Sequence, residues 1–396
     1  MSLNDALVTR ETGCPFDPHS RLGATRAQNP LARMTYPDGH EGWLATGYAE
    51  TRAILADQRF SSRYELAHFP FPGMENLESL PPAPPGDMTG MDAPEHTRFR
   101  KQLIGKFTVR RMRQLTERVE QVTAEHLDAM AERGPTVDLV PAFAYPVPAV
   151  MICELLGVPY EERETFQRLI EAIFNPDGAP EDMYAAYGSV MAYIGDLVTA
   201  KRAAPTDDLL SDLAAGDDFT HEELAGIGAF LLGAGLDTTA NQLALGTFAL
   251  LENPGQVEAL LADPDRAVEE LLRYLTITHT GVRAALADVE IGGQLIRAGE
   301  SVTFSILAAN RDPERFADPD RLDLSRDAVG HLTFGHGIHQ CLGQQLARVE
   351  MRVAFPALFR RFPTLRLAGA VELRPGHQNI YGVRRLPVSW DSTGRP

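Results

Sequence analysis

The spacing of apolar and polar residues predicts a mainly helical chain with a few short strands. Apolar residues recur at helical spacing over residues 48–58, 108–132, 160–203 and 266–274, which gives each segment one apolar stripe. The longest such pattern follows Thr220-His221-Glu222-Glu223, which fits a capping box, and stops at Asn253-Pro254. A helix over 221–252 would be about 48 Å long at 1.5 Å per residue, enough to cross the whole protein.

The strand patterns are shorter and lie between these helices. We expect strands at 42–46, 278–284, 289–296 and 302–307, and a strand–turn–strand unit over 371–390 with Ile380-Tyr381-Gly382 at its tip. Residues up to about 30 are rich in turn formers, and residues 69–90 are dense in Pro and Gly. A long loop inside a compact domain is often functional. No linker or repeat divides the chain, so we expect one domain over residues 1–396.

Composition and charge narrow the class of protein. Of the 396 residues, 44% are hydrophobic, which is ordinary for a globular protein. The net charge of −17 argues against nucleic acid as a partner. The most apolar stretch, 140–159, contains three prolines and Glu154, so we expect no membrane insertion. Three widely spaced cysteines and no signal-peptide pattern at the N-terminus favour the cytoplasm.

One cysteine stands in the loop Phe334-Gly335-His336-Gly337-Ile338-His339-Gln340-Cys341-Leu342-Gly343, before a helical pattern that begins near Leu342. Glycines permit tight bends and the close approach of a flat ligand. Free N–H groups at a helix start favour a thiolate, and a lone thiolate suits an axial ligand of haem iron. The alternatives are a small buried apolar residue or a zinc site with His336 and His339, although the sequence lacks the second ligand cluster that zinc sites usually use.

Three further groups of polar residues stand out earlier in the chain. His96 and Arg100 follow Pro94, which fits a first helical turn, and lie on one helix face, where they could clamp a carboxylate or simply face solvent. The long helix contains Gly233-Ala234-Gly235-Leu236-Asp237-Thr238-Thr239, an acid and two threonines among apolar residues, which indicates a use beyond close helix packing. Glu270 and Arg273 are spaced to pair on one helix.

Taken together, the four groups resemble the motifs of the cytochrome P450 family. Phe334-x-x-Gly337-x-x-x-Cys341-x-Gly343 looks like the family's haem-binding signature, and the other groups precede it in the family's order. The version found here is similar to soluble bacterial, especially actinobacterial, members. The resemblance implies a mainly α fold with small β-sheets, a triangular helical prism that encloses haem b.

The resemblance also implies roles for individual residues. Cys341 would be the axial ligand of the iron, and Asp237 and Thr238 would relay protons during O2 activation. Glu270 and Arg273 would form a buried network near the thiolate. The haem would contact His96, Arg100, Arg283, His339, Phe334, Gly335 and Gly343. The substrate would be lined by Phe230, Ala234, Ile277, Val282, Ile380 and Tyr381, with the 69–90 loop and the 166–190 region.

The implied activity is monooxygenation, the hydroxylation or epoxidation of a bulky organic molecule such as a macrolide or other polyketide. Electrons would come from a ferredoxin and its ferredoxin reductase, because the chain shows no flavin or nicotinamide motif. A basic patch for docking could consist of Arg98, Lys101, Arg110, Arg111, Arg113, Arg348 and Arg352. A peroxide-driven peroxygenase and a non-catalytic haem sensor are the alternatives, and neither would need Asp237 and Thr238.

Overall fold

The computed structural model describes residues 2–71, 74, 80–106, 109–159, 162, 165, 168–169, 172–173, 179–374 and 380–394. The helices are α1 Leu3–Val8, α2 Ser20–Gln28, α3 Tyr48–Ala56, α4 Glu95–Ile104, α5 Val109–Arg133, α6 Pro146–Leu156, α8 Pro180–Ala203, α9 Leu209–Ala214, α10 His221–Glu252, α11 Val257–Ala262, α12 Pro264–Leu275, α13 Ile306–Ala309 and α14 Gln344–Arg361. The strands are β1 Leu31–Thr35, β2 Glu41–Ala45, β3 Phe60–Ser61, β4 Thr136–Asp138, β5 Thr280–Ala285, β6 Val289–Ile291, β7 Gln294–Ile296, β8 Ser301–Ser305, β9 Arg366–Leu367, β10 Glu372–Leu373, β11 Val383–Arg385 and β12 Pro387–Ser389.

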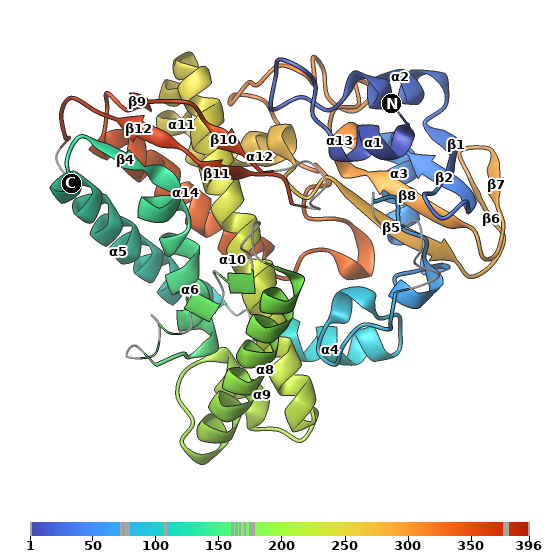
Figure 1. Cartoon of the computed structure of the whole chain (residues 1–396), viewed down its shortest axis with the longest axis horizontal. Coiled ribbons are helices and arrows are strands. Elements are labelled where there is room, and N and C mark those ends of the chain that lie inside the picture. Colours follow the sequence, from blue (N-terminus) through green and yellow to red (C-terminus); the bar gives the residue numbers. More distant parts are fainter. Residues whose placement is uncertain are drawn as a thin grey trace.

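Helix α10 runs through the middle of the molecule, with α8, α6 and α14 packed around it (Figure 1). It begins and ends at the predicted residues. The predicted capping box is present: the Thr220 hydroxyl accepts from the Glu223 amide at 3.1 Å, and the Thr220 amide donates to the Glu223 carboxylate at 2.8 Å. Gly246 allows α14 to approach, because a Cβ there would overlap the Phe355 ring. The long helix is therefore the scaffold on which the other helices are placed.

A five-stranded sheet lies on the other side of α10 from α5 and α14 (Figure 1). Its strand order is β1-β2-β8-β5-β3, and only the β2–β8 pair is parallel. Strand β8 ends at Ser305, not at Leu307 as predicted. The Ser305 hydroxyl accepts from the Ala308 amide at 3.2 Å and starts α13 instead. This sheet holds Arg283, one of the predicted haem contacts, in the middle of β5.

From their turn formers we expected turns over the residues up to about 30, and this prediction was wrong, because α1 and α2 lie there. Ser2 and His19 cap these helices, and Leu7 and Leu22 are buried. Such short helices carry too few turns for a clear period. Pro94 precedes α4 rather than lying inside it. No helix among the described residues is long and apolar enough to cross a membrane.

The downstream end of the 69–90 loop is seated on α10. A Cβ at Gly226 would overlap the carbonyl oxygen of Pro85, and one at Gly86 (φ +92°) would overlap the backbone of Gly226. The loop and the helix therefore meet backbone to backbone at these two positions, a distance of approach that only glycine permits. Two parts of the chain that the sequence analysis covers lie outside the described residues: 72–73 and 75–79 of this loop, and most of 160–179. The rest of the helix predicted over 160–203 is α8.

Candidate active site

The Cys341 loop is a tight turn held by its own backbone. The Cys341 amide donates to the Phe334 carbonyl at 2.8 Å. Gly335 and Gly337 have φ +69° and +75°, and a Cβ at Gly337 would overlap the Leu55 carbonyl oxygen. α14 begins at Gln344 rather than at Leu342, with Gly343 as its N-cap. The loop thus presents a single thiol at a fixed position.

The environment of Cys341 differs from the prediction in one respect. Part of the Cys341 residue is exposed to solvent, yet protein atoms surround the thiol on its other sides. Burial raises the pKa of the thiol, so it outweighs the helix start that we expected to dominate. The N–H groups of Gly343 and Gln344 and the charges of Arg100 and Arg348 act in the opposite direction. A bound metal cation would supply the remaining stabilisation of a thiolate.

His96, Arg100, Arg283 and His339 come together as predicted. The rings of His96 and His339 are 4.1 Å apart between centroids, and Arg100 donates to the Gln340 carbonyl. His339 Nε2 lies 2.9 Å from the Ser62 hydroxyl. Within the described part of the chain, Arg283 is seen to donate to the carbonyl of its neighbour Val282 alone, at 2.8 Å. Two guanidinium groups and two imidazoles therefore share one small region.

No carboxylate is paired with these four side chains among the residues that the structure describes. His96 is 1% exposed, and its Nε2 has no hydrogen-bond partner among the described residues. Burial, with the charges of Arg283, His96 and Arg100, lowers the pKa of His339 to about 3. Burial lowers the pKa of Arg283 to about 10. Such a cluster calls for carboxylates, and the two propionates of haem fit it.

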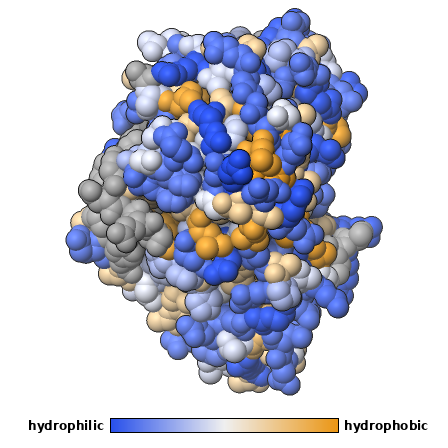
Figure 2. All heavy atoms as spheres, turned by 90° about the vertical axis from the view of Figure 1, so that its right-hand side faces the viewer, coloured by the Kyte–Doolittle hydropathy of each residue, from blue (hydrophilic) through white to orange (hydrophobic). Residues whose placement is uncertain are grey.

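A cleft of about 850 Å³ leads from the outside to this cluster. It lies between the end of α3, the 82–95 segment and the start of α10, and Arg283 and His339 line it. Apolar lining residues include Phe60, Met91 and Leu286. Figure 2 shows the face of the molecule toward the sheet, where apolar side chains gather among hydrophilic ones.

The middle of α10 is open, in contrast to its flanks. Ala234 is exposed and Gly233, Gly235 and Thr238 are partly exposed, whereas residues 224–229 and 239–250 are buried. This stretch of the helix is therefore exposed while the helix on either side of it is packed, which leaves open space beside it. The Thr238 hydroxyl donates to the Ala234 carbonyl at 2.7 Å. Its oxygen can still accept a hydrogen bond from a group in that space.

Asp237 is 2% exposed, and both of its carboxylate oxygens have partners. Asn241 donates to it at 3.0 Å, and the two terminal nitrogens of Arg374 lie 2.9 and 2.7 Å from its two carboxylate oxygens. Sequence reasoning missed Arg374, which is far along the chain and belongs to no motif. It also missed Asn241. A Cβ at Gly382 would overlap the Asn241 amide, so this glycine lets the C-terminal turn reach the helix.

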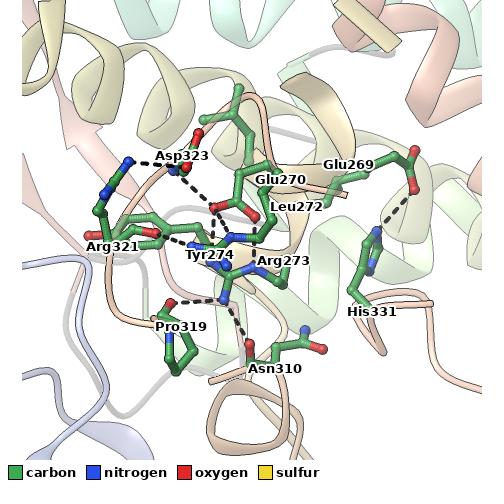
Figure 3. Close-up of polar contacts among 12 residues, drawn as sticks. Glu269, Glu270, Leu272, Arg273, Tyr274, Asn310, Pro319, Arg321, Asp323 and His331 are labelled. Atoms are coloured by element: carbon green, nitrogen blue, oxygen red, sulfur yellow. Dashed lines mark hydrogen bonds and ion pairs between the residues drawn. The ribbon is translucent and has the colours of Figure 1, made fainter. Parts of the chain in front are cut away.

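Glu270 and Arg273 form the predicted buried pair (Figure 3). Their side chains are 0% exposed, and two hydrogen bonds of 2.7 and 2.9 Å join them. Arg273 also donates to the carbonyls of Asn310 and Pro319. Glu270 accepts from the Asp323 amide and from Arg326, both at 3.1 Å. The pair thus ties α12 to the irregular segment before the cysteine loop, and Arg326 is a partner that no spacing rule indicated.

The predicted basic patch is mostly neutralised by carboxylates. Arg98 pairs with Glu223, Arg110 and Arg111 with Asp207, Arg348 with Glu269, and Arg352 with Asp265. Sequence alone did not show these partners, because they come from segments distant in the chain, such as α10, α12 and the turn before α9. Lys101 and Arg113 are the two members for which the described residues show no ion pair.

The predicted substrate-lining residues divide into two groups. Phe230 and Ala234 lie on the central helix. Ile277 and Tyr381 are joined by a hydrogen bond of 2.9 Å from the Tyr381 amide to the Ile277 carbonyl, next to the bridge between Thr278 and Ile380. The Tyr381 ring lies under the Arg10 guanidinium at 4.3 Å, so it contacts the N-terminal segment. Val282 packs with Ala67 and Ala284. Of the proposed 166–190 lining, residues 166–167, 170–171 and 174–178 lie outside the described residues, and the part from Pro180 onwards belongs to α8.

This combination of fold and site matches known proteins. A sequence model of the cytochrome P450 family matches residues 264–373. Cytochrome P450 105C1 of a Streptomyces species is 48% identical over 382 residues, covering 95% of this chain and 96% of the relative. The chain therefore belongs to the cytochrome P450 family. It is a P450 monooxygenase of the CYP105 type, a haem protein with a mainly α fold and small sheets.

Two further relatives are similar over almost the whole chain. Pentalenic acid synthase of Streptomyces avermitilis is 41% identical and covers 95% of each chain. The crystal structure of CYP105P1 in complex with filipin I has a TM-score of 0.88 at 42% identity, covering 97% of this chain and 98% of that one. P450 enzymes use O2 and a redox partner.

Proposed function

We propose that this protein hydroxylates or epoxidises a bulky natural product of the macrolide or wider polyketide class. The names of the relatives support this proposal, because one makes pentalenic acid and another was solved with filipin I. Cys14, Cys153 and Cys341 form no disulfide within the described part of the chain, which is consistent with a reducing cytoplasm, where we place the enzyme.

The observation that carries the proposal is the open middle of α10. Small residues at Gly233, Ala234 and Gly235 leave room beside the helix, and Ala234 is exposed within an otherwise buried element. Glycines inside a helix cost roughly 0.5–1 kcal/mol each relative to alanine. An enzyme that must admit both O2 and a large organic molecule to one face of a helix has a use for that space.

Cys341 would hold the haem iron, and His96, Arg100, Arg283 and His339 would bind the two propionates by charge-assisted hydrogen bonds. When bound, the haem supplies O2 binding and cleavage of the O–O bond. The tight backbone of the loop keeps the Cys341 sulfur in one place, and Gly335, Gly343 and Phe334 shape the surface beside it.

Thr238 and Asp237 would deliver protons. Thr238 lies in the open middle of α10, where its oxygen can accept a hydrogen bond from water. The Asp237 carboxylate is held by Arg374 and Asn241, so it must first turn away from Arg374 before it can carry a proton. Arg374 thereby fixes the position of the carboxylate beside Thr238 between turnovers.

Electrons would come from a ferredoxin and its reductase. Lys101 and Arg113, which have no ion pair among the described residues, are the cations that we propose for docking. Arg98, Arg110, Arg111, Arg348 and Arg352 contribute less charge to the surface, because their carboxylate partners offset it.

The ligand assignment is tested by Cys341→Ala. The reduced, CO-treated wild type should show the red-shifted Soret band of thiolate-ligated haem, and the variant should lose it. Cys14→Ala is the matched control and should keep the band. An unchanged spectrum in Cys341→Ala would remove the central assignment.

The reaction type is tested by comparing turnover with NADH, ferredoxin and ferredoxin reductase against turnover with peroxide. A panel of polyketides, first selected by the shift that each causes in the haem spectrum, supplies the substrates. A monooxygenase should form hydroxylated or epoxidised product with the electron donors. Product with peroxide alone would indicate a peroxygenase, and no product in either assay would favour a sensor.

A further inference from the structure

A second carboxylate network lies beside the Glu270–Arg273 pair. Glu269, the preceding residue on α12, points away from Glu270 and towards His331 (Figure 3). Its two oxygens lie 2.6 and 3.0 Å from Nε and a terminal nitrogen of Arg348, and 3.2 Å separates it from His331 Nε2. Arg352 is more distant, at 3.8 Å. Hydrogen bonds from His331 and Arg348 hold the pKa of Glu269 at about 2 despite its burial.

Arg348 contacts both ends of the cysteine loop. Its guanidinium carbon lies 4.5 Å from the centre of the Phe334 ring, and Phe334 is the residue whose carbonyl accepts from the Cys341 amide. Arg348 also donates to the Gln344 carbonyl at 3.3 Å and to the Gln344 side chain at 3.1 Å. Gln344 begins the helix whose first N–H groups face the Cys341 sulfur.

The side chain of Arg348 is 15% exposed and that of Glu269 is 12% exposed, so solvent screens this charge pair only in part. A cation beside the thiolate stabilises the form of the site that has gained an electron. A carboxylate paired with that cation offsets part of the effect. The two members of one ion pair therefore influence electron acceptance in opposite directions.

We propose that Glu269 is a positioning residue that acts through Arg348: it fixes the guanidinium against Phe334 and the start of α14, and it sets how much of that charge the iron site experiences. The pair thereby tunes the reduction potential of the haem. This inference rests on the proposed ligation of iron by Cys341.

The test is a spectroelectrochemical titration of the full-length, haem-loaded protein without substrate. Arg348→Met should make reduction harder, and Glu269→Gln should make it easier, each by about tenfold in the reduction equilibrium. Arg348→Lys keeps the charge and should stay near the wild type. Arg352→Met removes the same charge at the more distant, 34% exposed position and should shift the equilibrium less than Arg348→Met.

Shifts of the same sign in Arg348→Met and Glu269→Gln would overturn the proposal, because loosening of the loop alone would affect both variants alike. Unchanged potentials would overturn it as well. If Glu269→Gln fails to retain haem, the comparison of Arg348→Lys with Arg348→Met decides, and equal potentials in these two variants would refute the role of the charge. A wild type without the thiolate Soret band would instead refute the proposed ligand.

Discussion

Two arginine–carboxylate pairs of the same chemistry occupy different settings in this protein. Glu270 and Arg273 lie on one helix, both 0% exposed, and backbone groups of the segment before the cysteine loop complete their hydrogen bonds. Asp237 and Arg374 join the central helix to the chain after β10, with side chains 3% and 14% exposed. Beyond Arg374, Asn241 is the one partner that the described residues provide for the Asp237 side chain.

This difference separates a structural pair from a functional one. Breaking the Glu270 pair would strand a charge where water cannot reach it, which is costly. Arg374 retains access to solvent, so its departure from Asp237 costs less. The same two functional groups therefore hold the fold in one place and can serve as a movable proton carrier in the other.

The largest expected effect is that of Glu270→Ala. It leaves Arg273 buried without its carboxylate and should destabilise the protein by about 3–5 kcal/mol, so that little haem is retained. The haem-to-protein absorbance ratio and thermal melting measure this. Glu372→Ala, which removes the half-exposed pair with Arg385, is the control and should change stability by about 0.5 kcal/mol or less. Full haem content in Glu270→Ala would contradict the structural role.

Asp237→Asn should leave the fold and the haem spectrum intact but lower turnover by about 10²-fold, because the amide cannot deliver a proton. Product formation with saturating ferredoxin and reductase is the measurement. A solvent isotope effect that grows in the variant would locate the loss at proton transfer. Wild-type turnover would place the relay elsewhere.

Glu350 sharpens the comparison because it is a buried carboxylate for which no ion pair is seen among the described residues. It is 3% exposed, one of its oxygens has no hydrogen-bond partner there, and burial raises its pKa to about 8. The folded state then binds a proton that the unfolded chain releases above pH 4.5. Stability should therefore fall as pH rises from about 4.5 to 8.

Glu350→Gln should remove this pH dependence, so that its gain in stability over the wild type grows steadily from pH 5 to pH 8. Melting temperatures of both haem-loaded proteins across that range provide the test. Parallel curves for the two proteins would show that Glu350 does not titrate there.

The smallest expected effect is that of Thr238→Ala, a several-fold fall in product formed per NADH, with the missing electrons recovered as peroxide. The hydroxyl that orients water for proton delivery is lost, while the haem spectrum stays normal because Thr238 does not bind iron. Thr247→Ala is a matched control, since that hydroxyl makes the same bond to the carbonyl four residues earlier at 2.8 Å, but in a buried part of α10. Unchanged coupling would refute the role of Thr238.

The sequence was sufficient for features that depend on local spacing. The ends of α10, the pairing of Glu270 with Arg273, and the tight Cys341 loop all follow from residues close together in the chain. It was insufficient for contacts made across the fold. Arg374 reaches Asp237 from a distant turn, Arg326 completes the Glu270 network, and carboxylates on other helices neutralise most of the predicted basic patch. The balance of forces at Cys341 also required the structure, because burial depends on every neighbouring segment.

The backbone contact between Gly86 and Gly226 has a consequence for how new specificities arise. A side chain at either position would collide with the other segment, so Gly226→Ala or Gly86→Ala must detach the loop end from the helix. Replacing both glycines would add both collisions, so each must stay glycine wherever the loop end is to remain on the helix. The contact is thus an anchor for the downstream end of the loop, and a change of substrate specificity that moves this end must give the contact up.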